Sequence, residues 1–292
     1  MIATTPTIDA ALRAGAALAI SISGGKDGQA MLKTLVPWYR AQGYTGPLYA
    51  IHADLGRTEW PQTAAHVERL AREAGVPLVV VRREQGDLLA RWQERMAALE
   101  GTGKPFWSSA ANRYCTSDLK RGPINKHLRR HQLVISAEGI RAAESPARAK
   151  KPVVSTREGI TSEKLIGLSP DDALAYRSFG QRLALTWNPI LHWTVDDVWQ
   201  ACGTSRADLA RRRELYQAGE VSAALDGWPA HPAYIYGNER LSCALCVLAS
   251  DNDIRNGARH NPALYQELRR MEIASGATFR HKRSLADIVE QR

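Results

Sequence analysis

Two hydrophobic periods alternate along the first half of the chain. Short apolar runs cover residues 17–22, 47–53, 77–81 and 133–137, and the stretches after the first three runs carry apolar side chains at helical spacing, over residues 29–41, 60–74 and 87–99. Strands that alternate with helices form parallel βαβ units. The pattern therefore predicts an α/β fold with a mostly parallel, doubly wound sheet that binds its ligand at the carboxyl ends of the strands.

The last third of the chain has a different pattern and is predicted to be mainly helical. Thr194 precedes two carboxylates in the manner of a helix N-cap, and a further helix is expected over residues 205–216. We therefore expect an α/β nucleotide-binding domain over residues 1–185 and a helical subdomain over residues 186–292 that carries a CxxC pair.

A glycine-rich turn joins the first apolar run to the first amphipathic helix. Gly24 and Gly25 allow positive φ angles, so that backbone N–H groups and the following helix dipole point toward one place. Lys26 adds a counter-charge for phosphate, and Asp27 adds a polar or metal-facing carboxylate. An ordinary strand-to-helix turn is the alternative, but the charges favour a phosphate loop. The expected loop comprises Ser23, Gly24, Gly25, Lys26, Asp27 and Gly28.

Two other strand ends carry polar residues that point to the same ligand. Asp54 follows the second apolar run, and we expect it to share a crevice with Ser23. Gly139 opens another strand-to-helix turn, and Arg141 is placed where its fork of N–H donors meets phosphate, with a surface salt bridge as the alternative. His52 lies inside its strand and is expected to be packed.

Charge and hydropathy limit the partners. The net charge of +9 implies an acidic partner, either a phosphate-rich small molecule or nucleic acid. The basic stretch 149–168 is interpreted as a solvated flap. No apolar run approaches the roughly 20 residues of a spanning helix, and the first residues lack the charged start of a secretory signal. We expect a cytoplasmic protein with no membrane partner.

The four cysteines separate into a pair and two single residues. In a reducing cytoplasm, Cys243 and Cys246 are better interpreted as a metal or redox pair than as a structural disulfide. As residues i and i+3 they are expected on one side of a helical turn. Cys202 follows an apolar helix and is expected to be buried packing.

Several motifs, in a consistent order over about residues 17–258, resemble one family. Residues 23–27 resemble the PP-loop of the adenine nucleotide α-hydrolase superfamily, which includes the N-type ATP pyrophosphatases. The other motifs resemble phosphoadenylyl-sulfate (PAPS) reductases. They are His52-Ala53-Asp54-Leu55-Gly56 with Glu59 and Pro61, Gly139 to Ser145 with Arg148, Asn188-Pro189-Ile190 with Trp193, Asp197, Val198 and Trp199, and His231-Pro232-Ala233-Tyr234 before Cys243.

The resemblance implies a set of site residues. It places Lys26, Asp27 and Arg141 in the catalytic site. The implied nucleotide-binding residues are Ser23, Gly24, Gly25, Lys26, Asp27, Gly28, Asp54, Gly139, Arg141 and Arg148. Family members with an iron–sulfur cluster carry a Cys-Cys pair before an RKxxPL run and a later CxxC. Here Tyr114-Cys115 precedes the similar run 119–124, so three of the four ligands are present: Cys115, Cys243 and Cys246 are implied ligands of a [4Fe–4S] cluster, or alternatively of zinc with a fourth ligand.

The chain departs from the family in two further places. Gly28 stands where the family usually has Ser or Thr, and the tail 280–292 lacks the family's catalytic cysteine. The favoured hypothesis is a PAPS-reductase-like enzyme that binds PAPS, APS or ATP in sulfur or nucleotide chemistry. One alternative is ATP-dependent adenylation, with Mg²⁺, followed by sulfur insertion into nucleic acid. Another is a non-catalytic nucleotide-binding accessory protein of a mobile element or defence system. A sulfur- or electron-donor protein and an oligomeric state are left open.

Overall fold

The computed structural model describes residues 1–290 and divides them into two compact units. Unit 1 comprises Met1–His52, Ala64–Val81 and Ile124–Asp208, and unit 2 comprises Ala53–Thr63, Arg82–Pro123 and the segment from Leu209 onward. This grouping differs from the expected division at residue 185. Beyond residue 185, the end of β6 (Leu183–Trp187) and α9 (Val195–Cys202) still belong to unit 1, where α9 packs on α2 (Lys26–Ala41). The last two residues of the expected helical subdomain, Gln291 and Arg292, lie outside the described residues.

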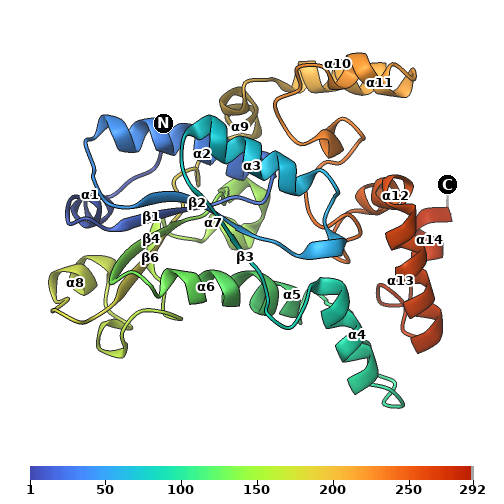
Figure 1. The fold of residues 1–292 in the computed structure, drawn as a ribbon, viewed down its shortest axis with the longest axis horizontal. Helices are drawn as coiled ribbons and strands as arrows, with labels where there is room; N and C mark the ends of the chain where they lie inside the picture. Colours follow the sequence, from blue (N-terminus) through green and yellow to red (C-terminus); the bar gives the residue numbers. More distant parts are fainter. Residues whose placement is uncertain (291–292) are drawn as a thin grey trace. The chain divides into compact units, whose positions relative to one another are not determined.

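A six-stranded sheet forms the centre of unit 1, in the order β3-β2-β1-β4-β6-β5 (Figure 1). β1 pairs in parallel with β2 and β4, and β4 pairs in parallel with β6. The predicted α/β fold with a mostly parallel sheet is thereby confirmed. The strands are β1 (Ala17–Ser21), β2 (Leu48–Ala53), β3 (Leu78–Val81), β4 (Leu133–Ala137), β5 (Val154–Thr156) and β6 (Leu183–Trp187).

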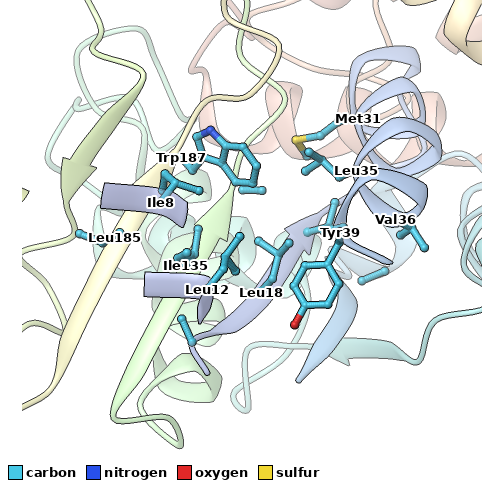
Figure 2. Packing of buried hydrophobic residues seen from close by; sticks show 14 of the residues in the cluster. Ile8, Leu12, Leu18, Met31, Leu35, Val36, Tyr39, Ile135, Leu185 and Trp187 are labelled. Carbon is cyan, nitrogen blue, oxygen red and sulfur yellow. The ribbon is translucent and has the colours of Figure 1, made fainter. Parts of the chain in front are cut away.

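Helices cover both faces of this sheet because both faces of its central strands are apolar. Along β1, Leu18 and Ile20 belong to the larger core cluster, whereas Ala17 and Ala19 belong to a smaller cluster on the opposite face. Figure 2 shows the larger cluster, in which side chains of α1 and α2 meet those of three strands. Its labelled members are Ile8, Leu12, Leu18, Met31, Leu35, Val36, Tyr39, Ile135, Leu185 and Trp187.

The helices of this unit follow the predicted pattern closely. Pro37 lies inside α2 without ending it. Thr194 caps α9 as expected, accepting a hydrogen bond from the Asp197 N–H. The helical elements are α1 (Pro6–Arg13), α2, α3 (Thr63–Ala74), α6 (Gly122–Leu128), the short helix Ala142–Glu144, α7 (Pro146–Ala149), the short helix Glu163–Leu165, α8 (Pro170–Ala175), α9 and the first residues of α10 (Arg206–Gln217). His52 is buried and contacts the Ile22 carbonyl through Nδ1 at 3.1 Å, which confirms its packing role.

The expectation of a solvated flap over residues 149–168 is wrong. Part of this stretch forms β5, which pairs antiparallel with β6 at the sheet edge. Arg157 follows β5 and lies largely buried, donating to Glu138 Oε1 at 2.7 Å and to Asn125 Oδ1 at 2.8 Å. A basic stretch can be buried here because a carboxylate and an amide from other elements accept hydrogen bonds from the Arg157 guanidinium.

Unit 2 is mainly helical and has its own core. Trp92, Trp107 and Phe279 pack together there, with Trp107 edge-on to both of the other rings. The elements are the short helix Gly56–Thr58, α4 (Leu88–Ala98), α5 (Tyr114–Thr116), the π-helical turn Ser117–Arg121, most of α10, α11 (Val221–Leu225), the short helix Pro232–Tyr234, α12 (Asp251–His260), α13 (Pro262–Ser275) and α14 (Leu285–Glu290). Within residues 1–290, no helix combines the length and the apolar character needed to cross a membrane.

Candidate functional site

The glycine turn starts α2 without a side-chain cap on its first N–H groups. β1 ends at Ser21, and Gly25 is the N-cap of α2 without a side-chain cap. Gly24 has φ +77°, a left-handed conformation that glycine adopts without a Cβ clash. The N-terminal N–H groups of a helix lack intrahelical acceptors, and the helix dipole adds partial positive charge there. The turn therefore has the backbone features that anion-binding helix N-termini share.

Three charged side chains gather at this helix end. Arg141 Nε lies 2.5 Å from Asp27 Oδ1, and Lys26 Nζ lies 3.3 Å from Asp27 Oδ2. Lys26 and Arg141 are each only 6% exposed, so both cations are largely removed from bulk water. The structure thus brings together three of the predicted site residues, with two cations and one carboxylate.

Two glycines allow close backbone approach around this helix end. A Cβ on Gly139 would lie 3.1 Å from the Asp27 carbonyl carbon, so the turn after β4 packs directly on the first turn of α2. A Cβ on Gly28 would lie 3.3 Å from Ile22 Cα, closer than side chains normally pack. This crowding gives a physical reason for glycine at position 28, where the resembled family usually has Ser or Thr.

Arg148 is placed one short helix beyond Arg141. Its guanidinium forms an ion pair with Glu144, and Glu144 also accepts a hydrogen bond from the Arg141 N–H at 3.0 Å. Ser145 caps the short helix α7 that carries Arg148. Glu144 therefore links the backbone of Arg141 to the side chain of Arg148, and the two arginines of the motif occupy one connected segment.

Helix α9 supports the first turn of α2 from behind. Lys26 Nζ lies 6.0 Å from the centre of the Trp199 ring, within reach of a cation–π contact. Cys202 Sγ donates to the Lys26 carbonyl at 3.4 Å, and Lys33 Nζ donates to the Cys202 carbonyl at 3.1 Å. Cys202 is 0% exposed, which confirms its predicted packing role, and burial raises the pKa of its thiol to about 12.

His66 on α3 is a contributor that the sequence analysis missed. Burial, with a smaller contribution from the nearby Arg69 charge, lowers the pKa of His66 to about 4, and its ring makes a hydrogen bond to the backbone of Gly24. Its Nδ1 also lies 3.0 Å from Arg69 Nη2. The available signal was its position in α3, four residues before the apolar Leu70 and on the buried side.

Asp54 belongs to unit 2 and is described with that unit. Its Oδ1 accepts a hydrogen bond from the Gly56 N–H at 2.7 Å, and its Oδ2 pairs with Arg82 Nε at 2.7 Å. The carboxylate therefore shapes the turn after β2 and has a cationic partner. The crevice that we expected it to share with Ser23 stays a prediction.

The three implied cysteine ligands all belong to unit 2. Cys115 lies on α5, and Cys243 and Cys246 bracket a turn. The expected helical turn is wrong, because residues 243–246 form a non-helical turn whose Ala244 N–H donates to the Thr58 carbonyl at 2.9 Å. Burial, and then the neighbouring Cys246, raise the pKa of Cys243 to about 12, and Cys115 also acts on it electrostatically.

The donor chemistry of these thiols suits a soft metal centre, since deprotonated thiolates bind zinc and iron–sulfur clusters. Over residues 1–290, however, no three His, Cys, Asp or Glu side chains form a group arranged to hold a metal ion. The predicted centre stays a prediction.

Gly257 on α12 holds the cysteine turn and was also missed by the sequence analysis. A Cβ at this position would lie 1.7 Å from the Ala244 carbonyl oxygen, which is inside the van der Waals radii of both atoms. Only glycine lets α12 approach the turn this closely. Its signal in the sequence was a glycine within a helical pattern, which often marks close packing.

Comparison with known proteins identifies related sequences. The family model of the phosphoadenosine phosphosulfate reductase domain matches residues 17–247. An uncharacterized 37.8 kDa protein from the gpa 5′ region of Escherichia phage 186 is 26% identical over 276 residues, which cover 80% of this chain and 68% of that protein. The crystal structure of phosphoadenylyl-sulfate (PAPS) reductase from Candida auris, in a phosphate complex, matches with a TM-score of 0.42 and 17% identity, covering 68% of this chain and 76% of that one.

Proposed function

The chain belongs to the phosphoadenosine phosphosulfate reductase domain family, and from this premise we propose that the glycine turn and the first turn of α2 bind the phosphates of an adenine nucleotide. One observation carries the proposal. Lys26 and Arg141 are buried together at an uncapped helix N-terminus, and both pair with Asp27. The candidate ligands of this site are PAPS, APS and ATP.

The electrostatics of this helix end favour an anionic ligand. Two buried cations and one carboxylate leave a net positive charge, to which the helix dipole adds. A bound phosphate supplies further negative charge and several hydrogen-bond acceptors for these buried cations. Arg141 donates to Asp27 through Nε, and the planar fork of its terminal N–H groups has the geometry that suits phosphate oxygens.

The reaction proposed is sulfur or nucleotide chemistry on that ligand. Cys202 is unsuited to act as a thiol nucleophile, because it is buried and its pKa is raised to about 12. A reductive step on PAPS or APS would therefore use another thiol of this chain or of a donor protein. Where ATP is the substrate, Mg²⁺ would accompany its phosphates, and Asp27 is the carboxylate at this helix end that suits it.

Calorimetry tests the binding step directly. Wild-type protein is titrated with ATP, PAPS and adenosine 3′,5′-bisphosphate, together with the Lys26→Ala and Lys164→Ala variants. Lys164→Ala is the control, because it removes one positive charge from an exposed position of the same unit. We expect Lys26→Ala to weaken binding about tenfold or more, as loss of a charged hydrogen bond does, and Lys164→Ala to leave it within twofold. Equal affinity in wild type and Lys26→Ala, or no binding below millimolar, overturns the site.

Product analysis separates the reaction classes. Sulfite formed from PAPS with a thiol reductant supports a reductase, and pyrophosphate released from ATP supports adenylation before sulfur insertion into an acceptor. Tight nucleotide binding with neither product supports a non-catalytic accessory role. Each reaction is compared with the Lys26→Ala variant, which should lose turnover if the same site is used.

A further inference from the structure

Two exposed aromatic side chains lie close together in the sequence of unit 1, Tyr176 at the C-cap of α8 and Phe179 in the turn that follows. Tyr176 is 71% exposed and Phe179 is 107% exposed, and among residues 1–290 these are the aromatic side chains that lie open to solvent. The other Trp, Tyr and Phe residues of the described chain are buried or half-buried. Large apolar rings gain free energy when buried, so two exposed rings this close in the sequence point to a surface that a partner covers.

The turn that carries Phe179 is held in a defined conformation. Gln181 closes it: its carbonyl accepts from Arg177 Nε at 3.0 Å, and its side-chain Oε1 accepts from the Ser178 N–H at 3.0 Å. Gly180 has φ +82° at the tip. A ring on a fixed turn loses less conformational entropy on binding than a ring on a mobile segment. The hydrogen-bonded turn thus holds the Phe179 ring in a fixed position in solvent, where a partner can contact it.

Basic residues gather around the base of this turn. Arg182 Nε donates to the His131 carbonyl at 3.2 Å, and the Arg182 N–H donates to Ser162 Oγ at 2.8 Å. These contacts bring the end of α6 and the residues before Lys164 beside the turn. The cations of this surface are Arg129, Arg130, Lys164, Arg177 and Arg182, and its exposed carboxylates are Glu158, Glu163, Asp171 and Asp172, the last two on α8 just before Tyr176. Five cations against four carboxylates give these residues a formal charge of +1.

This surface is distinct from the proposed nucleotide site. The Leu183 N–H donates to the Gln132 carbonyl, so the basic residues lie at the amino ends of β4 and β6. Gly139 and Arg141 follow the carboxyl end of β4, which is the opposite end of these strands. A ligand on the turn would not occupy the phosphate loop.

We propose that the aromatic turn 176–181 and its surrounding cations bind single-stranded nucleic acid. Unpaired bases stack on exposed aromatic rings, while arginine and lysine bind the backbone phosphates. A duplex keeps its bases stacked inside and offers Phe179 no ring to contact. An acidic peptide would use the cations but would give no reason for two exposed rings.

Fluorescence anisotropy with a labelled single-stranded oligonucleotide of mixed sequence tests the proposal, using about 20 nucleotides at about 50 mM salt. We expect Phe179→Ala to weaken binding about five- to tenfold, because each stacked base contributes that much, and Phe179→Trp to retain binding. Ile273→Ala is the control, since Ile273 is a 70% exposed apolar residue of unit 2. No binding by wild type, or equal loss in the Ile273→Ala control, overturns the proposal.

Charge reversal provides an independent measurement. Arg130→Glu and Lys164→Glu should each weaken binding and reduce its salt dependence, whereas Lys104→Glu, an exposed lysine of unit 2, should change it less than twofold. Tighter binding to anionic lipid vesicles or to duplex DNA than to the single strand contradicts the assignment. Phe179→Ala should keep wild-type ATP affinity by calorimetry, so this proposal and the nucleotide site fail or succeed separately.

Discussion

The glycine turn of unit 1 and the cysteine turn of unit 2 use the same packing device for different chemistry. In each, a glycine of another element lets backbone approach backbone: Gly139 against the Asp27 peptide, and Gly257 against the Ala244 carbonyl. The first turn offers backbone N–H groups, which are in place once α2 forms. The second offers thiols, whose geometry depends on side chains from distant segments. A site made from backbone is therefore preorganised by local folding, whereas a site made from side chains needs tertiary contacts or a ligand to complete it.

The largest expected effect is the loss of bound metal when one thiol of the cysteine turn is removed. If Cys115, Cys243 and Cys246 hold one metal centre, Cys243→Ser should lose most of the bound metal, because three thiolates leave no spare ligand. Cys202→Ser should retain it, since Cys202 is buried in unit 1. Anaerobic purification followed by iron, sulfide and zinc analysis measures this. Metal that survives Cys243→Ser but falls with Cys202→Ser contradicts the assignment, as does metal-free wild type.

The glycine behind the cysteine turn gives the next largest effect. Gly257→Ala should lower the free energy of unfolding by about 3 kcal/mol, because its methyl group overlaps the Ala244 carbonyl and the core must shift. Urea unfolding measures the change. The control is Arg259→Ala on an exposed position of the same helix, expected within about 0.5 kcal/mol. A Gly257→Ala protein as stable as wild type shows that the turn can move freely.

The histidine behind the glycine turn makes stability depend on pH. His66 has a pKa of about 4 in the folded protein and about 6.5 when unfolded, so the unfolded state binds more protons between these values. The stabilising contribution is complete above pH 6.5 and is lost as the pH falls toward 4. We expect a loss of about 2 kcal/mol between pH 7.5 and 5.

Urea unfolding at several pH values checks this contribution. His66→Gln should flatten the pH dependence by that amount relative to wild type. His131→Gln is a suitable comparison, because burial also lowers the pKa of His131 but its ring lies away from the glycine turn, against Tyr49. Identical pH profiles for wild type and His66→Gln would falsify the role given to His66.

The smallest effect is expected where α9 supports α2. Cys202→Ser keeps a donor for the Lys26 carbonyl and should cost about 1 kcal/mol of stability, whereas Cys202→Ala loses the donor and leaves a small cavity. If α9 positions Lys26, nucleotide affinity should fall in the order wild type, Cys202→Ser, Cys202→Ala. Calorimetry with ATP measures it, and equal affinity in all three proteins limits Cys202 to packing.

Some features of this protein follow from its sequence because they are local. The strand, the glycine turn and the helix of residues 17–41 are encoded by neighbouring residues, and the cap at Thr194 needs only the next three positions. The alternation of such units predicts the α/β class, since parallel strands need helical crossovers. The burial of His52 and Cys202 also follows from their position within apolar stretches.

Other features were decided only by the tertiary structure. The strand order and the antiparallel edge strand β5 depend on pairing between distant segments. The basic stretch 149–168 therefore predicts a flap from its own composition, although part of it forms β5. Likewise, Arg141 meets Asp27 across more than a hundred residues, and Gly257 is required only because the Ala244 carbonyl lies against it. Local periodicity carries no information about which distant groups will meet, because burial and close approach are properties of the packed chain.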